Sequence, residues 1–416
     1  MNQMMRTNPT KLNPWTVGLA AAGVVSLASV ASAEEAQHQV MTALSATTLS
    51  GYVDTSAIWG FGKGNNLVGR SFDQGAFQSG VATAAGVNKQ DGFNLNVVKL
   101  QLSKPLDEGQ WSAGYTVGLL FGPDANVLSS GSALAPGTVG TSDFAVKDAY
   151  VALRAPIGTG LDLKIGTWTT VLGYEVTEAG DNPNYSRSYG FYLEPIVHTG
   201  ILASYKVCEG FSISGGVADR GDFNNINSRS GIESLKTYVG QVVLTAPESF
   251  GFLKGATAYA AVCDGGVSSP ATTPGHASGS KDVVNFYAGA TVPTPLEGLS
   301  VGVAFDYRAS GVFDKSYENA IGGYAIYQAT EKLKLATRTE YATSSGTGFG
   351  GTPTGNAQNV ALLGNTVTLD YKLWENVISR LEFRWDHSMN GQRYFGSGVP
   401  DRRNTCSLAL NVIYKF

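Results

Sequence analysis

The last eleven residues of the chain, 406–416, alternate between two unlike faces. Every second residue, starting from the first, is apolar or aromatic, and the residues between them are mostly small or polar. A repeat of two residues is the geometry of a β-strand, whose successive side chains point to opposite faces. The segment also has the length of a tilted strand that crosses a bilayer, roughly 9–11 residues. The end of the chain therefore predicts one membrane-crossing strand that finishes at Phe416.

The same repeat recurs through the chain and predicts sixteen strands, with fourteen or eighteen as alternatives. One segment, 93–103, changes phase at Val97-Val98, which predicts a β-bulge there. The predicted strands are 48–60, 93–103, 110–121, 146–154, 161–170, 201–207, 211–219, 235–245, 253–262, 283–292, 299–308, 323–329, 333–343, 363–373, 377–388 and 406–416.

The connections between these segments alternate strictly between long and short. Seven are short turns, and eight are long and rich in Gly, Ser, Asn, Thr and Pro. Outer-membrane barrels have short periplasmic turns and longer extracellular loops, and closure of a barrel removes both sheet edges. We therefore predict an all-β fold: a transmembrane antiparallel up-and-down β-barrel over residues 48–416, in which the first and last strands pair. A large soluble all-β protein is the alternative fold.

The low charge is unusual for a soluble protein, and the lack of a long apolar segment argues against a helical membrane protein. Charged residues make up 15% of the chain, against about 25% in soluble domains. Beyond the N-terminal segment, no apolar run reaches the roughly 20 residues that a membrane helix needs. The 52 glycines, 19 tyrosines and 18 phenylalanines suit a β-barrel. No basic patch points to nucleic acid as a partner.

The first 33 residues have the pattern of a bacterial export signal. Arg6 and Lys11 give a basic start, residues 15–30 are apolar, and Ala31-Ser32-Ala33 is a small-x-small cleavage site. We expect cleavage after Ala33, a short lead over residues 34–47, and export of the barrel to the bacterial outer membrane.

Neither a metal site nor a catalytic site emerges from the sequence. The four histidines do not cluster, and the cysteine spacings match no metal or redox motif; the cysteines are Cys208, Cys263 and Cys406. The only catalytic candidate is Asp386-His387-Ser388, but alternate residues of a strand point to opposite faces. We predict no enzyme activity, no metal and no cofactor.

The polar faces of the predicted strands carry too many charges to face lipid. In 377–388, apolar residues on one face oppose four charged residues on the other. Each charge would cost roughly 2–4 kcal/mol on a lipid face at mid-membrane, so this face is expected to line a watery lumen. Residues of 333–343 repeat the pattern. The candidate residues for the pore wall and for selectivity are Arg380, Arg384, Arg338, Lys334, Glu382 and Asp386. The alternative role for each charge is only to keep the wall hydrated and paired.

One long connection, residues 171–195, differs in composition from the others. Its sequence GYEVTEAGDNPNYSRSYGFYLEP combines acidic residues with five aromatic ones, whereas the other long loops are mostly Ser, Gly, Ala and Thr. Packed inside the lumen, it would narrow the pore and set acids opposite a basic wall, a field that selects solutes by charge. The alternative is a cap over the mouth. The candidate constriction residues are Glu175, Glu178, Asp181, Tyr185, Arg187 and Tyr189.

Several stretches of this sequence resemble the OmpL-like family of outer-membrane β-barrel porins. They are LSGYVDTSAIWGFG, VVKLQLSKPLDEGQWSAGY followed by LLFGPDAN, VKDAYVALRAPIGTGLDLKIG, and GYEVTEAGDNPNYSRSYGFYLEPIVHTGILASY. The resemblance runs from about residue 49 to residue 416. It implies an outer-membrane barrel that acts as a passive pore, and it supplies no catalytic or ligand motif.

These observations favour a porin, a passive diffusion channel for small hydrophilic solutes. The alternatives are a channel specific for one solute, such as a sugar that stacks on loop aromatics, and a structural or adhesive barrel without transport. The expected partners are outer-membrane lipid, small polar solutes and, in a homotrimer, two further copies of the chain. The aromatic C-terminal residue also resembles the signal that barrel-assembly machinery reads.

Overall fold

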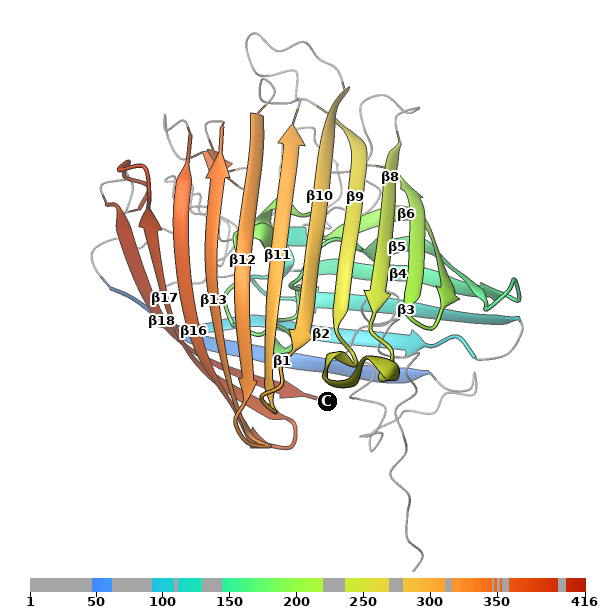
Figure 1. The fold of residues 1–416 in the computed structure, drawn as a ribbon, viewed down its shortest axis with the longest axis horizontal. Helices are drawn as coiled ribbons and strands as arrows, with labels where there is room; N and C mark the ends of the chain where they lie inside the picture. Colours follow the sequence, from blue (N-terminus) through green and yellow to red (C-terminus); the bar gives the residue numbers. More distant parts are fainter. Residues whose placement is uncertain are drawn as a thin grey trace, which may run out of the picture.

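The computed structural model describes residues 47–61, 92–107, 111–128, 144–219, 236–268, 280–310, 316–345, 348–349, 352–353, 359–395 and 402–416. The predicted export signal and all but the last residue of the predicted lead lie outside these ranges. Within them, sixteen antiparallel strands form one closed barrel (Figure 1). The predicted fold class and strand number are confirmed. No helix of the described residues is both long and apolar enough to span a membrane.

The barrel strands follow one another around the ring in chain order. They are β1 (Thr48–Phe61), β2 (Gly92–Lys104), β3 (Ser112–Phe121), β4 (Phe144–Ala155), β5 (Leu161–Thr169), β6 (Val197–Cys208), β7 (Phe211–Ala218), β8 (Thr237–Thr245), β9 (Thr257–Ser268), β10 (Ser280–Pro293), β11 (Leu299–Ser310), β12 (Ser316–Gln328), β13 (Leu333–Ser344), β16 (Ala361–Trp374), β17 (Val377–Ser388) and β18 (Asn404–Lys415). The remaining elements are the hairpin of β14 (Gly348–Phe349) and β15 (Thr352–Pro353), the helix α4 (Ala125–Leu128), and the 3-10 helices η1 (Ala179–Asp181), η2 (Gly190–Leu193) and η3 (Glu248–Leu253).

Several predicted strand starts are wrong, and two of these errors have a clear local reason. β12 begins at Ser316, whereas the sequence predicts a start at residue 323. The predicted start is late because the outward Asn319 interrupts the apolar pattern. The Asn319 side chain accepts a hydrogen bond from Thr343 at 3.0 Å. β9 begins at Thr257 rather than at residue 253. The residues before it form η3 and a turn in which Gly255 has a φ of +80°, a conformation that favours glycine.

The first and last strands close the barrel, as predicted. The β1–β18 ladder runs from Tyr52 opposite Lys415 to Phe61 opposite Cys406. Beyond it, Gly51 N donates to Phe416 O at 2.9 Å, and Phe416 N donates to Gly51 O at 3.0 Å. A β-carbon at residue 51 would collide with the Lys99 carbonyl and the Phe416 ring, so this close pairing requires a glycine.

The two faces of the barrel differ as the alternation predicts. In β17, Leu381 and Phe383 point outward and are 42% and 45% exposed, whereas the charged residues between and beside them are buried inside. Large apolar side chains are likewise exposed on the outer face of other strands, for example Val367 of β16 at 55%. An apolar outer face and a polar lumen are the surfaces that a membrane barrel presents to hydrocarbon and to water.

In the described strands, two β-bulges turn consecutive side chains inward. In β2, the register with β1 skips Asn96, one residue before the predicted bulge, and both Asn96 and Val97 are buried. In β4, the register with β3 skips Lys147, so both Lys147 and Asp148 are buried inside. The second bulge was not predicted. It brings into the lumen a lysine that simple alternation would place outside.

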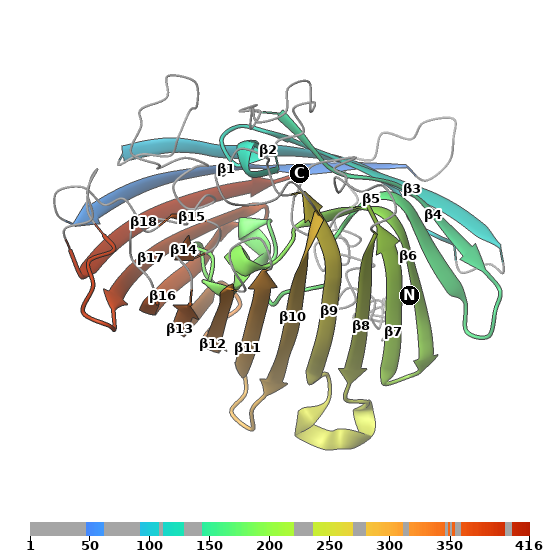
Figure 2. The same cartoon turned by 90° about the horizontal axis from the view of Figure 1, so that it is seen from above.

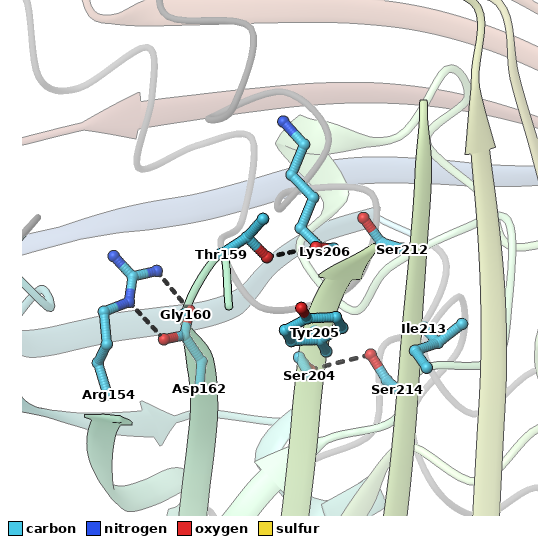
Figure 3. A pocket seen from close by; sticks show the side chains of 10 residues that line it. All are labelled: Arg154, Thr159, Gly160, Asp162, Ser204, Tyr205, Lys206, Ser212, Ile213 and Ser214. Carbon is cyan, nitrogen blue, oxygen red and sulfur yellow. Dashed lines mark hydrogen bonds and ion pairs between the residues drawn. The ribbon is translucent and has the colours of Figure 1, made fainter. Parts of the chain in front are cut away.

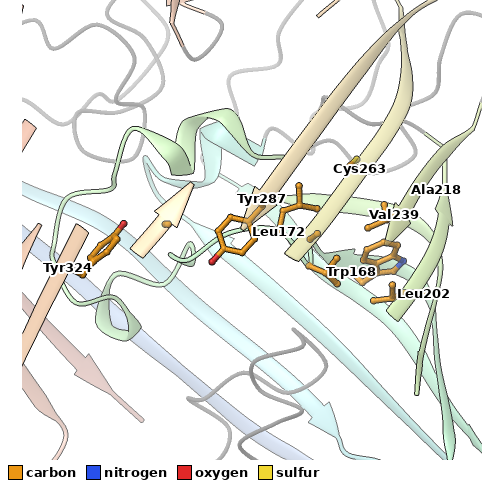
Figure 4. Close-up of a cluster of buried hydrophobic side chains, with 11 residues drawn as sticks. Trp168, Leu172, Leu202, Ala218, Val239, Cys263, Tyr287 and Tyr324 are labelled. Atoms are coloured by element: carbon orange, nitrogen blue, oxygen red, sulfur yellow. The ribbon is translucent and has the colours of Figure 1, made fainter. Parts of the chain in front are cut away.

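Part of the barrel interior is apolar. A buried cluster lies on the inner face of β5 to β12, and Figure 4 shows its labelled members around Trp168 and Tyr287. Leu172, which follows β5, packs within this cluster. The cluster members are Trp168, Val171, Leu172, Leu202, Ala218, Val239, Ala261, Cys263, Tyr287, Ala304 and Tyr324.

Replacement of Val367 by arginine tests which face meets hydrocarbon. An arginine there should lower the free energy of unfolding by about 2–4 kcal/mol in lipid vesicles, because Val367 lies near the middle of β16 and points outward. Urea titration of the folded barrel measures the change. The control is Val367→Leu, which should leave stability nearly unchanged; an arginine variant as stable as the leucine variant would contradict the assignment.

Candidate functional site

The connection between β5 and β6 lies inside the ring of strands. We call residues 171–195 the inner loop; its two 3-10 helices, η1 and η2, are seen within the barrel from above (Figure 2). The side chains of Tyr185, Arg187 and Tyr189 are at most 4% exposed. The partners of the loop are inward side chains of the barrel wall.

Three arginines of the wall bind the main-chain carbonyls of the inner loop. Arg338 donates to the carbonyl oxygens of Ser186 at 2.7 Å and Arg187 at 3.1 Å, and Arg384 donates to that of Arg187 at 2.6 Å. Arg380 donates to three carbonyls in and beside η1, those of Ala179, Gly180 and Asn182. An irregular loop has no sheet partner for these carbonyls, and the forked guanidinium group supplies several donors at once.

Carboxylates of the wall bind the main-chain N–H groups of the same loop. Glu382 accepts hydrogen bonds from the backbone of Tyr185 at 2.6 Å and of Ser186 at 2.9 Å. Glu340 accepts from the backbone of Tyr189, whose hydroxyl donates to Asp386 at 2.6 Å. The loop backbone is thus held by both cations and anions, and such charge-assisted hydrogen bonds are stronger than neutral ones.

The charges of this wall also pair with one another. Arg338 contacts Glu175 of the inner loop at 2.8 Å and Glu340 at 3.0 Å, and Arg384 contacts Glu340 at 3.1 Å and Asp386 at 3.0 Å. All five side chains are at most 1% exposed. Each buried charge depends on its partner here, because removal of one leaves the other unpaired inside the barrel.

A second set of charges holds the inner loop from β2 and β4, which follow β1 in the ring of strands. Glu178 accepts from Lys99 of β2 at 2.5 Å and from Lys147 of β4 at 2.8 Å. Burial alone would raise the pKa of Glu178, but the two ammonium groups outweigh it and hold this pKa well below its ordinary value. The bulge in β4 makes this contact available. Nearby, Asp181 pairs with Lys415 of β18 at 2.7 Å.

The structure brings most of the predicted site residues together. Five of the six wall candidates contact the inner loop directly. The sixth, Lys334, pairs instead with Asp370 at 3.0 Å, and Asp370 in turn binds Arg380 at 2.9 Å. Among the loop candidates, the side chain of Arg187 donates to the carbonyls of Val176, Tyr185 and Thr177 within its own loop.

Sequence reasoning missed the lysines that bind Glu178. Lys147 is hidden by the bulge, since alternation with its neighbours in β4 would turn it outward. Lys99 lies beyond the phase change in β2, and only its position after that change marks it as inward. The predicted candidates also omit Glu340, which shares the inward face of β13 with Arg338. They omit Asp370 of β16 as well, which lies opposite Lys334 and Arg380 of the neighbouring strands.

A separate small pocket lies at the short-turn end of the lumen, away from the inner loop. In Figure 3, Arg154 of β4 and Asp162 of β5 form a two-pronged ion pair, with distances of 2.6 and 2.7 Å. Ser204 and Ser214 share a hydrogen bond of 2.9 Å beside it. The two side chains bind each other, and the lining of this pocket includes no residue of the inner loop. Arg154 therefore gives a control position.

The comparison with protein families gives one match across the barrel. The family described as "Putative beta-barrel porin-2, OmpL-like" matches residues 46–416. None of the curated proteins matches the chain.

Several solved structures share the fold at low sequence identity. The outer membrane channel DcaP of Acinetobacter baumannii is 12% identical, with a TM-score of 0.57, over 91% of this chain and 100% of its own. An anion-selective porin from Comamonas acidovorans is 13% identical, with a TM-score of 0.54, over 89% and 99%. OmpT of Vibrio cholerae, in a trimer form, is 12% identical, with a TM-score of 0.54, over 89% and 100%. All three support the barrel architecture.

Replacement of Arg338 by methionine should release the inner loop. The change leaves Glu175 and Glu340 without this partner, and removal of one member of a buried ion pair costs about 3–5 kcal/mol. We expect trypsin to cleave the folded variant after Arg187, which is buried in the native protein. Mass spectrometry identifies the cut. Arg154→Met is the matched control and should protect Arg187 as well as the wild type does; equal protection in both variants would contradict the role of Arg338.

Replacement of Glu178 by glutamine should make the free energy of unfolding less sensitive to acid pH. Because the pKa of Glu178 is depressed, its contribution is present above its ordinary value of 4.5 and is lost as the pH falls through the depressed value. Urea titrations from about pH 3 to about pH 7 should show a smaller loss in the variant. The exposed turn residue Glu331 is the control site. A Glu178→Gln variant that follows the wild type as closely as Glu331→Gln does would refute the assignment.

Proposed function

The chain belongs to the beta-barrel porin-2, OmpL-like family, and we propose that it is a passive diffusion channel for small hydrophilic solutes in the bacterial outer membrane. The support is a closed barrel of sixteen strands, apolar outside and largely polar inside. A barrel of this size is wide enough to leave an aqueous channel. Diffusion through such a channel needs no energy source.

The inner loop narrows this channel, and its attachment to several strands of the wall is the observation that carries the proposal. Arg380 binds it from β17, and Lys147 binds it from β4. A loop held at several points by buried charges has a defined position, so the narrow zone sets a size limit for solutes. The basic wall acts on solutes mainly through the loop that it positions, because its arginines are already paired.

The charges left to meet solutes are those that remain partly exposed. The Lys334 side chain is 26% exposed and the Lys415 side chain is 36% exposed, whereas the three wall arginines are nearly inaccessible. Lysines on the turn side of the inner loop therefore contribute more to ion preference than the arginines do. Oppositely charged partners, Asp370 and Asp181, moderate this preference.

No catalytic step belongs to the proposal. Asp386 is buried inside the barrel, while His387 points outward and shares a hydrogen bond of 2.7 Å with Asn404. The two side chains thus lie on opposite faces of β17 and cannot act on one substrate.

Partly buried tyrosines favour a second candidate, a channel selective for sugars. Tyr174 of the inner loop stacks on Tyr324 of β12 with ring centroids 4.2 Å apart, and Tyr150 and Tyr259 pack beside the same cluster. Aromatic faces along a polar path can hold sugar rings by stacking. Faster liposome swelling with sugars than with polyols of equal size would favour this candidate over general diffusion.

The partners that we propose follow from the ends and the outer face of the barrel. Phe416 lies on the outer face beside β1, where barrel-assembly machinery could read the final strand. The apolar outer face meets lipid. A homotrimer is the assembly proposed, by analogy with the trimer form of OmpT from Vibrio cholerae.

Removal of residues 178–189 tests the channel and its narrow zone together. In planar bilayers, the wild-type protein should produce single-channel steps, and the shortened variant should conduct severalfold more because the lumen is less filled. The altered mobility of the unheated barrel in electrophoresis is the control for folding. Absence of steps in the wild type would refute the channel, and equal conductance of both forms would refute the narrowing.

A further inference from the structure

Two acidic side chains meet where the inner loop returns to the wall. Glu194 is the last acidic residue of the loop, and Asp306 projects inward from β11. Their carboxyl groups lie within hydrogen-bonding reach of each other. A hydrogen bond between two carboxyl groups requires that one of them carries a proton, because two carboxylates have only acceptors and repel each other.

Glycines on both arms of the loop pack against this pair. A β-carbon at Gly190 would overlap the Asp306 carboxyl group, and one at Gly173 would overlap that of Glu194. Gly173 also has a φ of +110°, which favours glycine. The pair is therefore enclosed by the beginning and the end of the inner loop, and Asp306 is 4% exposed. The next residue back, Leu193, accepts a hydrogen bond from Asn285 of β10 at 2.6 Å.

Among the described residues that act on the pair, none brings a positive charge that could replace the proton. Tyr287 lies directly across from Asp306 on β10, and its hydroxyl has no hydrogen-bond partner among the described residues. Glu175 adds negative charge, and the guanidinium group of Arg338 is committed to Glu175 and Glu340. Burial, then the charge of Asp306, and then that of Glu175 raise the pKa of Glu194 well above its ordinary value.

We propose that a proton shared by Glu194 and Asp306 latches the returning end of the inner loop to β11, and that alkaline pH releases it. Loss of the proton leaves two negative charges in contact inside the barrel. The latch is fully present below the ordinary value for a glutamic acid, 4.5, and is lost as the pH rises through the raised value. The returning end thus responds to pH in the opposite direction from Glu178, whose contacts are lost in acid.

Hydrogen exchange of the folded barrel tests the latch without reference to transport. Protection factors for residues 186–196 should fall in the wild type as the pH rises from about 4 to about 9, by about tenfold for each pH unit until the latch is lost. In Glu194→Gln the amide donates to Asp306 without a shared proton, so protection should stay constant. Asp306→Asn is a second variant with the same expectation. Constant protection in the wild type, or an equal fall in both variants, would overturn the proposal.

Single-channel recording adds a readout that rests on the proposed function. The wild-type conductance and its open-channel noise should increase over the same pH range, whereas Glu194→Gln should be insensitive to pH. Glu331→Gln, on an exposed turn, should behave like the wild type. Absence of conductance at every pH would refute the channel and leave the exchange experiment to decide the latch. A conductance that responds to pH equally in Glu194→Gln would overturn the latch alone.

Discussion

The interior of this barrel depends on how an irregular loop satisfies its main-chain polar groups. In a strand, each N–H and C=O finds its partner in the neighbouring strand, but the inner loop has no such neighbour. Guanidinium groups bind its carbonyls and carboxylates bind its N–H groups, as Arg338 and Glu382 show. A buried main-chain group without a partner costs free energy comparable to a lost hydrogen bond. The charge pattern of the wall meets this requirement.

The fold was readable from the sequence because two periodicities agree. Alternating side chains define each strand, and alternating connection lengths define the two ends of the barrel. The errors occur where a local feature breaks the first periodicity: the outward Asn319 hides the start of β12, and the bulge at Lys147 turns inward a residue that alternation places outside. In β4 it is the register with β3 that reveals the bulge, and register is set by contacts that one strand's sequence does not contain.

The residues of the site could be predicted from the sequence, but the partners that each of them binds could not. Charges on a membrane barrel must face the lumen, so Arg380, Arg384 and Arg338 could be assigned to the wall. Whether they bind solutes, each other or a loop depends on distances between residues about 150 to 200 positions apart in the sequence. Arg187 shows why the pairing could not be predicted. Its positive charge suits an ion pair across the lumen, yet its side chain stabilises its own loop by binding three of that loop's carbonyls.

The closure of β1 onto β18 sets the order in which this interior can be built. The hydrogen bonds from the wall to the inner loop join residues separated by 151 positions for Tyr189 and Glu340 and by 234 positions for Asp181 and Lys415. Strands made last therefore supply the partners of a segment made in the first half of the chain. Until β13 and β17 are in place, the main chain of Ser186 lacks the partners that Arg338 and Glu382 provide. The strands that close the barrel also supply the partners of the inner loop. Closure of the barrel and attachment of the inner loop are thus coupled.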